Sequence, residues 1–371
     1  MVLPDYPHSL LALAASVLRH YGAATPHPGL AALDRLLAER PYRNVAVLLF
    51  DGLGMNVLER HLPPDSFLRR HLAAPISSVF PPTTTAATVS VETGLSPAEH
   101  GWLGWSLWFE EIGAAVSVFS NTRSGSDGVP AADYHVARRY LPYVNLLDKI
   151  RAATGGAVAA EHVSPFSSEH PVTSVEELCG TVRRLCGGAG RRYLYGYWNQ
   201  PDYDIHDHGV GHPRIAALVE EIDRAVAALC AELTDTLVLV IADHGMTDVE
   251  YVRLADHPVL ADCLARTPSL ELRAASFTLR PGMEAQFVST YRAVFPEHLL
   301  LSRDEALASG LLGPGKLHPR APGFLGDYLG IATGPRTLET TGRPLEELFR
   351  AAHAGLSGEE LTVPLIAARC E

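Results

Sequence analysis

Three acidic residues occur where chemistry could be built around a metal ion. Asp51, Asp202 and Asp243 each follow a run of apolar or aromatic residues. His244 is adjacent to Asp243, and His206 follows Asp202 by four residues, so that these two share one face of a helical turn. Carboxylate and imidazole side chains together suit zinc better than manganese or iron. The residue types and their spacing predict a metal centre, with enough ligands for two ions if a further histidine comes from the carboxyl-terminal region.

A threonine-rich stretch, Pro81-Pro82-Thr83-Thr84-Thr85, adds a candidate nucleophile. Two prolines cannot lie inside a helix but can introduce one, so the stretch predicts a helix start. The helix is expected to run to about Thr93 and to end at Gly94. Free N–H groups and the helix dipole favour a phosphate at such a start, and a metal ion can turn a hydroxyl there into an alkoxide. Threonines that only cap the helix explain the same residues.

The residues around these groups predict the elements that position them. Residues 45–50 and 236–242 are continuous apolar runs, typical of parallel strands buried on both faces, and residues 192–198 indicate an aromatic strand. Because α/β folds place their chemistry at the carboxyl ends of such strands, the three acids are expected to meet there. Further strands are predicted at residues 76–80, 270–279 and 326–332, and helices at residues 8–21, 29–39, 144–153, 174–186, 213–233, 283–295, 345–352 and 357–368.

Composition and charge restrict the class of protein. The 371 residues are 47% hydrophobic and 19% charged, which is ordinary for a soluble globular chain of one or two domains. The formal net charge of −12 argues against a nucleic-acid polymer as a partner, but not against a small phosphate ester held by metal ions. The sequence predicts no membrane-spanning segment, and five scattered cysteines without a CxxC pair indicate reduced thiols in a cytoplasmic protein.

Each motif also has a purely structural interpretation. Asp51 can serve as a helix N-cap, and Asp243-His244-Gly245 can be an ordinary turn. Histidines in a local cluster commonly do no more than solvate a loop, which applies to His206, His208 and His212. A cluster of aromatic residues has two interpretations: it packs in the core, or it forms a wall that stacks on a flat group of the substrate. The residues are Trp102, Trp105, Trp108 and Phe109.

Taken together, the motifs resemble those of the alkaline phosphatase superfamily, and most closely its type I phosphodiesterase / nucleotide pyrophosphatase family. The segment Phe80-Pro81-Pro82-Thr83-Thr84, with residues 93–101, is similar to the family's nucleophile segment. The other signatures occur in the family's order: Asp51-Gly52, Asp202 with His206, Asp243-His244-Gly245, and His353. Each motif alone is weak, but the ordered set is specific. The resemblance covers about residues 42–104, 190–250 and 322–371.

The resemblance implies a role for each of these residues. Thr84 matches the threonine nucleophile, because it lies four residues after Phe80 and nine before Thr93; Thr83 and Thr85 are the alternatives. The ligands implied for one zinc ion are Asp51, Asp243 and His244, with Thr84 Oγ also in contact. The ligands implied for the other are Asp202, His206 and His353, with His318 as the rival for the last place.

The resemblance also implies a fold and an activity. The expected fold is a three-layer α/β sandwich with a mainly parallel central sheet, forming one catalytic domain over residues 1–371 with smaller α+β insertions at about 105–190 and 251–321. The expected enzyme hydrolyses a phosphodiester or pyrophosphate bond through a phosphothreonine intermediate. Its expected cofactors are two divalent metal ions, with zinc favoured over manganese. Its expected partner is a small phosphate-ester substrate, which includes nucleotides.

The charge near the threonines bears on the substrate. The sequence has no Arg or Lys between His71 and Gly113, which favours a diester, a pyrophosphate bond or a phosphonate over a phosphomonoester dianion. Within the same superfamily, the alternatives are a phosphonate hydrolase and a phosphomonoesterase. A non-catalytic metal-binding scaffold protein is the alternative of another class. Its only support is Ala87, which offers no side-chain donor to a phosphoryl oxygen.

Overall fold

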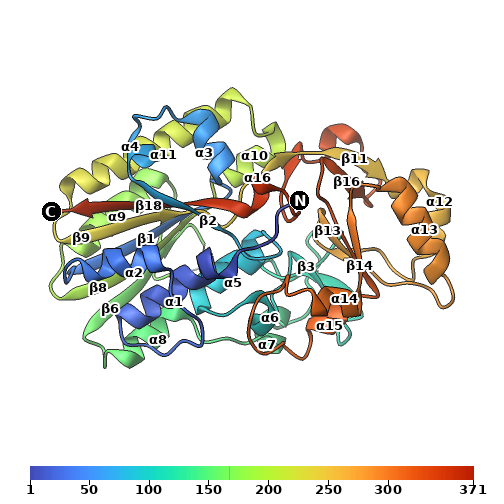
Figure 1. The fold of residues 1–371 in the computed structure, drawn as a ribbon, viewed down its shortest axis with the longest axis horizontal. Helices are drawn as coiled ribbons and strands as arrows, with labels where there is room; N and C mark the ends of the chain where they lie inside the picture. Colours follow the sequence, from blue (N-terminus) through green and yellow to red (C-terminus); the bar gives the residue numbers. More distant parts are fainter. Residues whose placement is uncertain (167) are drawn as a thin grey trace.

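Within residues 1–166 and 168–371, which the computed structural model describes, seven strands form a central sheet (Figure 1). In spatial order they are β2 (Leu72–Ser77), β18 (Thr362–Cys370), β9 (Thr236–Ile241), β1 (Asn44–Phe50), β8 (Arg191–Trp198), β6 (Val158–Ser164) and β7 (His170–Pro171). All run parallel except β18, which is antiparallel to both of its neighbours. The mainly parallel sheet predicted from the apolar runs is confirmed.

Helices cover both faces of the central sheet (Figure 1). One layer consists of α1 (Leu10–His20), α2 (Ala31–Ala38), α5 (Thr84–Thr93) and α8 (Leu146–Ala153). The other consists of α3 (Met55–His61), α4 (Phe67–Arg70), α9 (Val175–Cys186), α10 (Asp202–His208) and α11 (Pro213–Glu232). β1 and β9 are buried at every position, because both of their faces are covered. The three-layer architecture therefore follows from the continuous apolar runs.

A second, antiparallel sheet lies beside the central one, on the right in Figure 1. Its strands in the described residues are β14 (Leu299–Ser302), β15 (Tyr328–Ile331), β13 (Ala274–Phe277), β12 (Ser269–Leu270), β3 (Ser106–Phe109), β4 (Ala114–Ser117) and β5 (Thr122–Arg123). The helices of the same region are α6 (Pro97–His100), α7 (Val136–Tyr140), α12 (Pro258–Asp262), α13 (Glu284–Val294), α14 (Arg303–Ala308) and α15 (Ala321–Phe324). We call this part of the molecule, residues 97–140 and 258–331, the second lobe.

Short elements complete the fold. Two-stranded sheets are formed by β10 (Thr247–Asp248) with β17 (Ala351–Ala352), and by β11 (Glu250–Arg253) with β16 (Arg336–Glu339). The remaining short helices are η1 (Tyr6–His8), η2 (Leu254–Asp256), η3 (Leu345–Glu347) and α16 (Gly358–Leu361). Within the described residues, no helix combines the length and apolar character needed to cross a membrane.

The helix predicted at residues 345–352 is wrong, and the helix predicted at 357–368 is correct only for α16, Gly358–Leu361. The first region contains η3 and β17, and most of the second belongs to β18 in the central sheet. Residues 363–368 are a continuous buried run with β-branched members, which fits a buried strand as well as a helix segment. Pro364 is tolerated because it faces Pro75 of β2, before pairing with β9 begins at Ile366.

Other predicted boundaries shift. The strand expected at 76–80 is β2, which ends at Ser77, and the strand expected at 270–279 is divided into β12 and β13 by a turn at 271–273. Residues 105–190, expected as one insertion, divide between the two sheets: β3 to β5 join the second lobe, whereas β6 and β7 join the central sheet. The pattern of β6, Val-Ala-Ala-Glu-His-Val-Ser, lacks the apolar run that made β1 recognisable.

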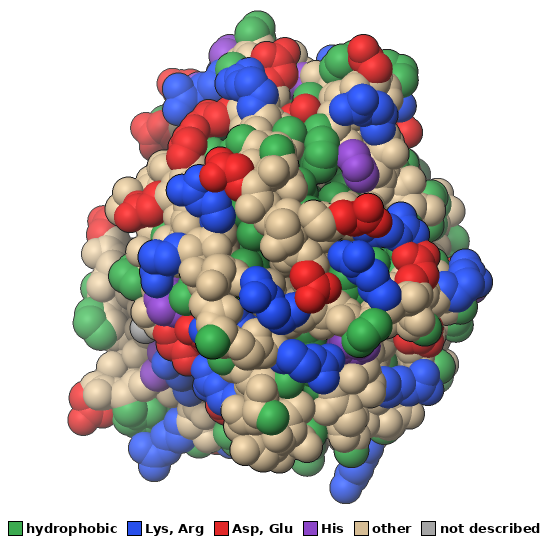
Figure 2. All heavy atoms as spheres, turned by 90° about the vertical axis from the view of Figure 1, so that its left-hand side faces the viewer, with side chains coloured by type: hydrophobic (Ala, Val, Ile, Leu, Met, Phe, Trp, Pro, Cys, Tyr) green, Lys and Arg blue, Asp and Glu red, His purple; other side chains and the backbone are tan. Residues whose placement is uncertain are grey.

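The amino ends of the parallel strands form a face with charges of both signs. Figure 2 views the molecule from this side and shows Lys and Arg side chains interspersed with Asp and Glu. A surface depression of about 590 Å³ here is lined by residues that include His20, Arg40, Tyr42 and Arg191. It lies at the opposite end of β1 from Asp51, so the depression and the predicted metal centre are separate features.

A buried ion pair joins the second lobe to the chain before β18. Arg273 donates to Glu360 through Nε–H (2.6 Å to Oε1) and Nη2–H (3.0 Å to Oε2), and neither side chain is exposed. The Gly355 N–H donates to Glu360 Oε1 (2.7 Å), and the Ser357 hydroxyl donates to Oε2 (2.6 Å). The pair therefore fixes the loop that follows His353.

Replacing Arg273 by Met is expected to lower the free energy of unfolding by about 3–5 kcal/mol, because Glu360 would remain buried without its cation. The double variant Arg273→Met, Glu360→Leu should recover part of the loss, since both charges are then gone. The exposed pair of Arg369 with Glu39 supplies the control: Arg369→Ala should have little effect on denaturant unfolding. If Arg273→Met and Arg369→Ala lowered the free energy of unfolding by the same amount, the buried Arg273–Glu360 pair would contribute no more to stability than an exposed pair.

Candidate metal centre and nucleophile

The predicted site residues come together at the carboxyl ends of the central parallel strands. Asp51 follows β1, and Asp243 and His244 follow β9. Asp202 and His206 lie on α10, just after β8, and their predicted placement on one helical face is confirmed. Two groups of side chains have ligand atoms within 4.8 Å of one another: Asp202, His206 and His353, and Asp51, Asp202 and His244.

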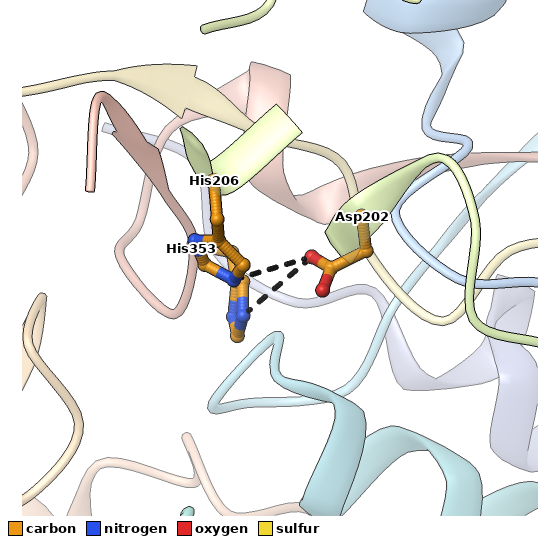
Figure 3. Close-up of side chains that lie close together, drawn as sticks. All are labelled: Asp202, His206 and His353. Carbon is orange, nitrogen blue, oxygen red and sulfur yellow. Dashed lines mark ion pairs between the residues drawn. The ribbon is translucent and has the colours of Figure 1, made fainter. Parts of the chain in front are cut away.

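The first group brings together two distant parts of the chain. Figure 3 shows the His206 and His353 rings side by side, both turned toward the Asp202 carboxylate. The Oδ1 atom of Asp202 lies 3.5 Å from His206 Nε2 and 3.9 Å from His353 Nε2. Two ligands of one zinc ion at tetrahedral angles are separated by about 3.3 Å, so a small inward movement would suffice for a shared ion.

The second group surrounds His244, which is fully buried. Its Nε2 atom lies 3.4 Å from Asp51 Oδ1 and 3.6 Å from Asp243 Oδ2. The other carboxylate oxygen of Asp243 accepts hydrogen bonds from the Gly52 and His244 N–H groups (3.1 and 3.0 Å), which orients Oδ2 toward the imidazole. Asp243 is therefore adjacent to this group, with one oxygen still available.

Glycines allow the strand ends to approach this closely. A Cβ atom on Gly245 would lie 1.9 Å from the Glu359 carbonyl oxygen. A Cβ atom on Gly52, which has φ +72°, would lie 2.8 Å from Asp202 Cβ. The glycines of the Asp51-Gly52 and His244-Gly245 motifs are thus required by packing around the acids.

Each histidine is held by its Nδ1 atom. The nearest carbonyl oxygens are Ala351 O for His206 (2.8 Å), Pro82 O for His353 (3.2 Å) and Gly245 O for His244 (3.2 Å). A carbonyl oxygen can only accept, so Nδ1 carries the proton and Nε2 presents a lone pair to the carboxylates. This is the tautomer that binds a metal ion.

Burial and neighbouring charges shift the pKa values of the clustered acids and of His353. Burial, together with the charges of Asp243 and Asp202, raises the pKa of Asp51 well above its usual value. Burial is also the main cause of the raised pKa of Asp243. Burial and the neighbouring His244 and His206 lower the pKa of His353, which keeps its imidazole neutral. These shifts all oppose charge in the buried cluster, and a bound cation would relieve the cost of ionising the acids.

Two buried oxygen atoms show that the residues fit a metal ion. Asp202 Oδ1 and Asp243 Oδ2 have no hydrogen-bond partner, although both are buried. Such orphaned acceptors cost free energy unless a ligand satisfies them. Both face histidine Nε2 atoms that are themselves acceptors, and a bound cation would satisfy all of these atoms together.

Thr84 is the threonine that faces this centre. It is the first residue of α5, and its Oγ1 atom lies 3.2 Å from His244 Nε2 and 3.5 Å from Asp51 Oδ1. The Thr83 hydroxyl donates instead to Glu271 (2.6 Å), and the Thr85 hydroxyl is buried without a partner. The predicted helix start is confirmed, and Gly94 ends the helix with φ +66°.

Other residues singled out in the sequence lie elsewhere. His208 and His212 stack on each other, with ring centroids 4.8 Å apart. Within the described residues, His318 joins neither metal-type group, and its ring lies against Gly101. The residues of the aromatic cluster have different environments. Trp102 and Phe109 are buried in the core, Trp105 is 46% exposed, and the Arg266 guanidinium lies over the ring of Trp108.

Three residues of the site were not predicted from the sequence. The Tyr197 hydroxyl donates to Asp51 Oδ2, and the Ser78 hydroxyl donates to the Asp243 carbonyl. Glu271 reaches the start of α5 from the second lobe. Tyr197 ends the alternating Tyr193, Tyr195, Tyr197 pattern of β8, which is a usable signal, but nothing local marks Glu271.

A buried cluster of carboxylates and imidazoles beside a helix-start hydroxyl, on this fold, defines a metal-dependent hydrolase of phosphoryl groups. The chain belongs to the family described as type I phosphodiesterase / nucleotide pyrophosphatase, which matches residues 45–295, more than half of its length. The resemblance noted in the sequence is therefore confirmed. No curated protein sequence matches the chain.

Solved structures of similar fold include two enzyme types. Murine ectonucleotide pyrophosphatase / phosphodiesterase 5 is 14% identical, with a TM-score of 0.65 over 88% of each chain. An inactive variant of it, in complex with AMP, gives a TM-score of 0.64 at 14% identity over 88% of this chain and 87% of that one. Phosphonoacetate hydrolase from Sinorhizobium meliloti 1021, in complex with phosphonoformate, is 19% identical, with a TM-score of 0.63 over 88% of this chain and 90% of that one. At these identities the likeness is one of fold.

Asp202→Asn is expected to reduce bound divalent metal by at least one ion per chain, because Asp202 belongs to both metal-type groups. The measurement is elemental analysis after dialysis against a dilute zinc buffer. Asp207→Asn is the control, since Asp207 is an exposed acid on the same helix. Unchanged metal content in Asp202→Asn would show that these groups do not bind metal.

Proposed function

We propose that this protein hydrolyses a phosphodiester or pyrophosphate bond through a covalent phosphothreonine on Thr84. The reaction uses two divalent metal ions, for which zinc is favoured over manganese. The observation that carries the proposal is the position of Thr84 Oγ1, within 3.5 Å of both Asp51 and His244 at the start of a helix. A hydroxyl in that position has a carboxylate and an imidazole on one side and free N–H groups on the other.

Seven residues would hold the metal ions. We assign Asp51, Asp243, His244 and Thr84 Oγ to one ion, and Asp202, His206 and His353 to the other. The orphaned oxygens of Asp202 and Asp243 and the three Nε2 lone pairs support this assignment. Mixed carboxylate and imidazole ligands favour zinc. When bound, divalent ions would supply Lewis acidity that stabilises charge on the phosphoryl group and lowers the pKa of a coordinated hydroxyl.

The chain itself positions the reacting groups. The first intrahelical hydrogen bond of α5 runs from the Ala87 N–H to the Thr83 carbonyl (2.9 Å), so the N–H groups of Thr84, Thr85 and Ala86 are not used within the helix. These N–H groups, with the helix dipole, can hold phosphoryl oxygens while Thr84 Oγ loses its proton, attacks phosphorus and displaces the alcohol or phosphate leaving group as its P–O bond breaks. Water then cleaves the phosphothreonine and restores the hydroxyl. The N–H groups also offer the donors that Ala87 cannot.

A second candidate is hydrolysis of a phosphonate or a phosphomonoester. It is favoured by the likeness in fold to phosphonoacetate hydrolase. The complex of a relative's inactive variant with AMP favours a nucleotide substrate instead. Arg273, whose charge contributes to the lowered pKa of His353, is already paired with Glu360. It therefore adds little to what the metal ions offer a second negative charge on phosphorus, so we rank the diester or pyrophosphate first.

Thr84→Ala should lower turnover of an aryl phosphodiester on the order of 10³-fold or more, because the attacking oxygen is removed. Metal content should stay close to that of the wild type, since six other ligands remain. Thr85→Val is the matched control, because it replaces a neighbouring buried hydroxyl that has no partner. Undiminished turnover in Thr84→Ala would refute the nucleophile assignment. A metal-replete wild type that cleaves no phosphate ester would favour the scaffold alternative.

A further inference from the structure

Glu271 brings a fourth carboxyl group to the site from the second lobe. It lies in the turn between β12 and β13, and its Oε1 atom accepts two hydrogen bonds. One comes from the Thr83 hydroxyl (2.6 Å) and the other from the main-chain N–H of Trp105 (2.7 Å). Glu271 is therefore fixed one residue away from Thr84, although it is distant in sequence. The metal centre and the nucleophile do not account for its position.

The backbone next to Glu271 is strained, and this conformation brings the Glu271 side chain close to residues 104 and 105. Leu270 is buried and has φ +85°, a conformation that costs a non-glycine residue about 1–2 kcal/mol. A Cβ atom on Gly104 would lie 2.9 Å from the Leu270 carbonyl oxygen, so the two segments can approach only because residue 104 is glycine. This approach places the Trp105 N–H against the Glu271 carboxyl group. Such strain commonly concentrates at functional sites.

The contact with Glu271 also bears on the role of Thr83 as a helix cap. Thr83 is the N-cap residue of α5, and a threonine there ordinarily accepts a hydrogen bond from an N–H group of the first turn. Its side chain makes no such bond, and its hydroxyl is turned to Glu271, to which it donates. The first-turn N–H groups therefore remain available for phosphoryl oxygens beside Thr84. The Glu271 carboxyl group is thus bound to the N-cap residue that directly precedes these donors.

The charges near Glu271 oppose a strongly anionic substrate. Burial raises the pKa of Glu271 to about 7, while the hydrogen bonds from Thr83 and Trp105 lower it. A dianion beside Glu271 therefore meets a carboxylate charge that offsets part of the attraction of the metal ions, or it binds with uptake of a proton. The nearby Arg273 does not compensate, because both of its hydrogen-bonding edges are engaged by Glu360 and main-chain carbonyls. A singly charged phosphorus centre avoids most of this repulsion.

We propose that Glu271 is a specificity-determining residue that selects phosphodiesters, whose phosphorus centre carries one negative charge, over phosphomonoesters, which carry two. This inference rests on the function proposed above and identifies the substrate class of the same site. Like charges placed side by side in a partly desolvated site cost enough to separate the two classes. The free first-turn N–H groups serve both classes, so the discrimination comes from Glu271.

The test compares bis(4-nitrophenyl) phosphate with 4-nitrophenyl phosphate at pH 8.5, on the zinc-loaded full chain. In Glu271→Gln, an amide oxygen can still accept from Thr83 and Trp105, but the charge is gone. The ratio of kcat/KM for the diester to that for the monoester should fall about tenfold, mainly through a lower KM for the monoester. Glu110→Gln, which removes an exposed charge on the neighbouring hairpin, should leave the ratio unchanged.

Glu271→Asp keeps the charge and should keep most of the preference for the diester. A loss of preference in Glu271→Asp as large as that in Glu271→Gln would assign the effect to geometry and overturn the proposal. An unchanged ratio in Glu271→Gln, or an equal loss for both substrates, would also overturn it. A wild type inactive on both esters would instead refute the proposed function. If Glu271→Gln does not fold, Glu271→Ala, which also removes the charge, is decided by the same ratio.

Discussion

The structure depends on the burial of several acids in one small volume. Asp51, Asp202 and Asp243 converge at the carboxyl ends of the parallel strands, and the buried Asp51 is held against the charges of the other two. Charge of one sign can be buried only if it is neutralised or paired. In the described residues the nearby imidazoles present lone pairs to these carboxylates, so the histidines do not supply the missing positive charge. Divalent cations would resolve this conflict, and we propose that the same cations serve hydrolysis.

The remaining architecture can be understood as support for that cluster. The parallel strands bring the acids to one edge, and glycines at 52 and 245 let the loops approach. The Arg273–Glu360 pair ties the second lobe to the loop after His353, and Ala354 in that loop has φ +92°. The second lobe in turn brings Glu271 to the start of α5. The lobe that we propose determines substrate choice is thus tied to the loop after His353, the residue that we assign to one of the metal ions.

The sequence predicted which residues come together at the candidate site better than it predicted the surrounding elements. The apolar runs of β1 and β9 specify buried strands, and the acids at their ends follow from the general geometry of parallel sheets. β18 was mistaken for a helix because an apolar run of six residues has no distinctive period, and its partners β2 and β9 are far away in sequence. Glu271 could not be found, since its position depends on the strained Leu270 and on the contact with Gly104. Long-range contacts of this kind leave no local pattern.

The central claim is that Thr84 becomes covalently phosphorylated during turnover. The most direct measurement is peptide mass spectrometry of the zinc-loaded protein, quenched in acid within the first turnovers of an aryl phosphodiester. The proposed mechanism predicts a phosphoryl or phosphoryl-ester adduct on the peptide that contains residues 83–85, located on Thr84 by fragmentation. An adduct on another residue, or sustained turnover without any adduct under conditions in which attack is faster than hydrolysis, would contradict it.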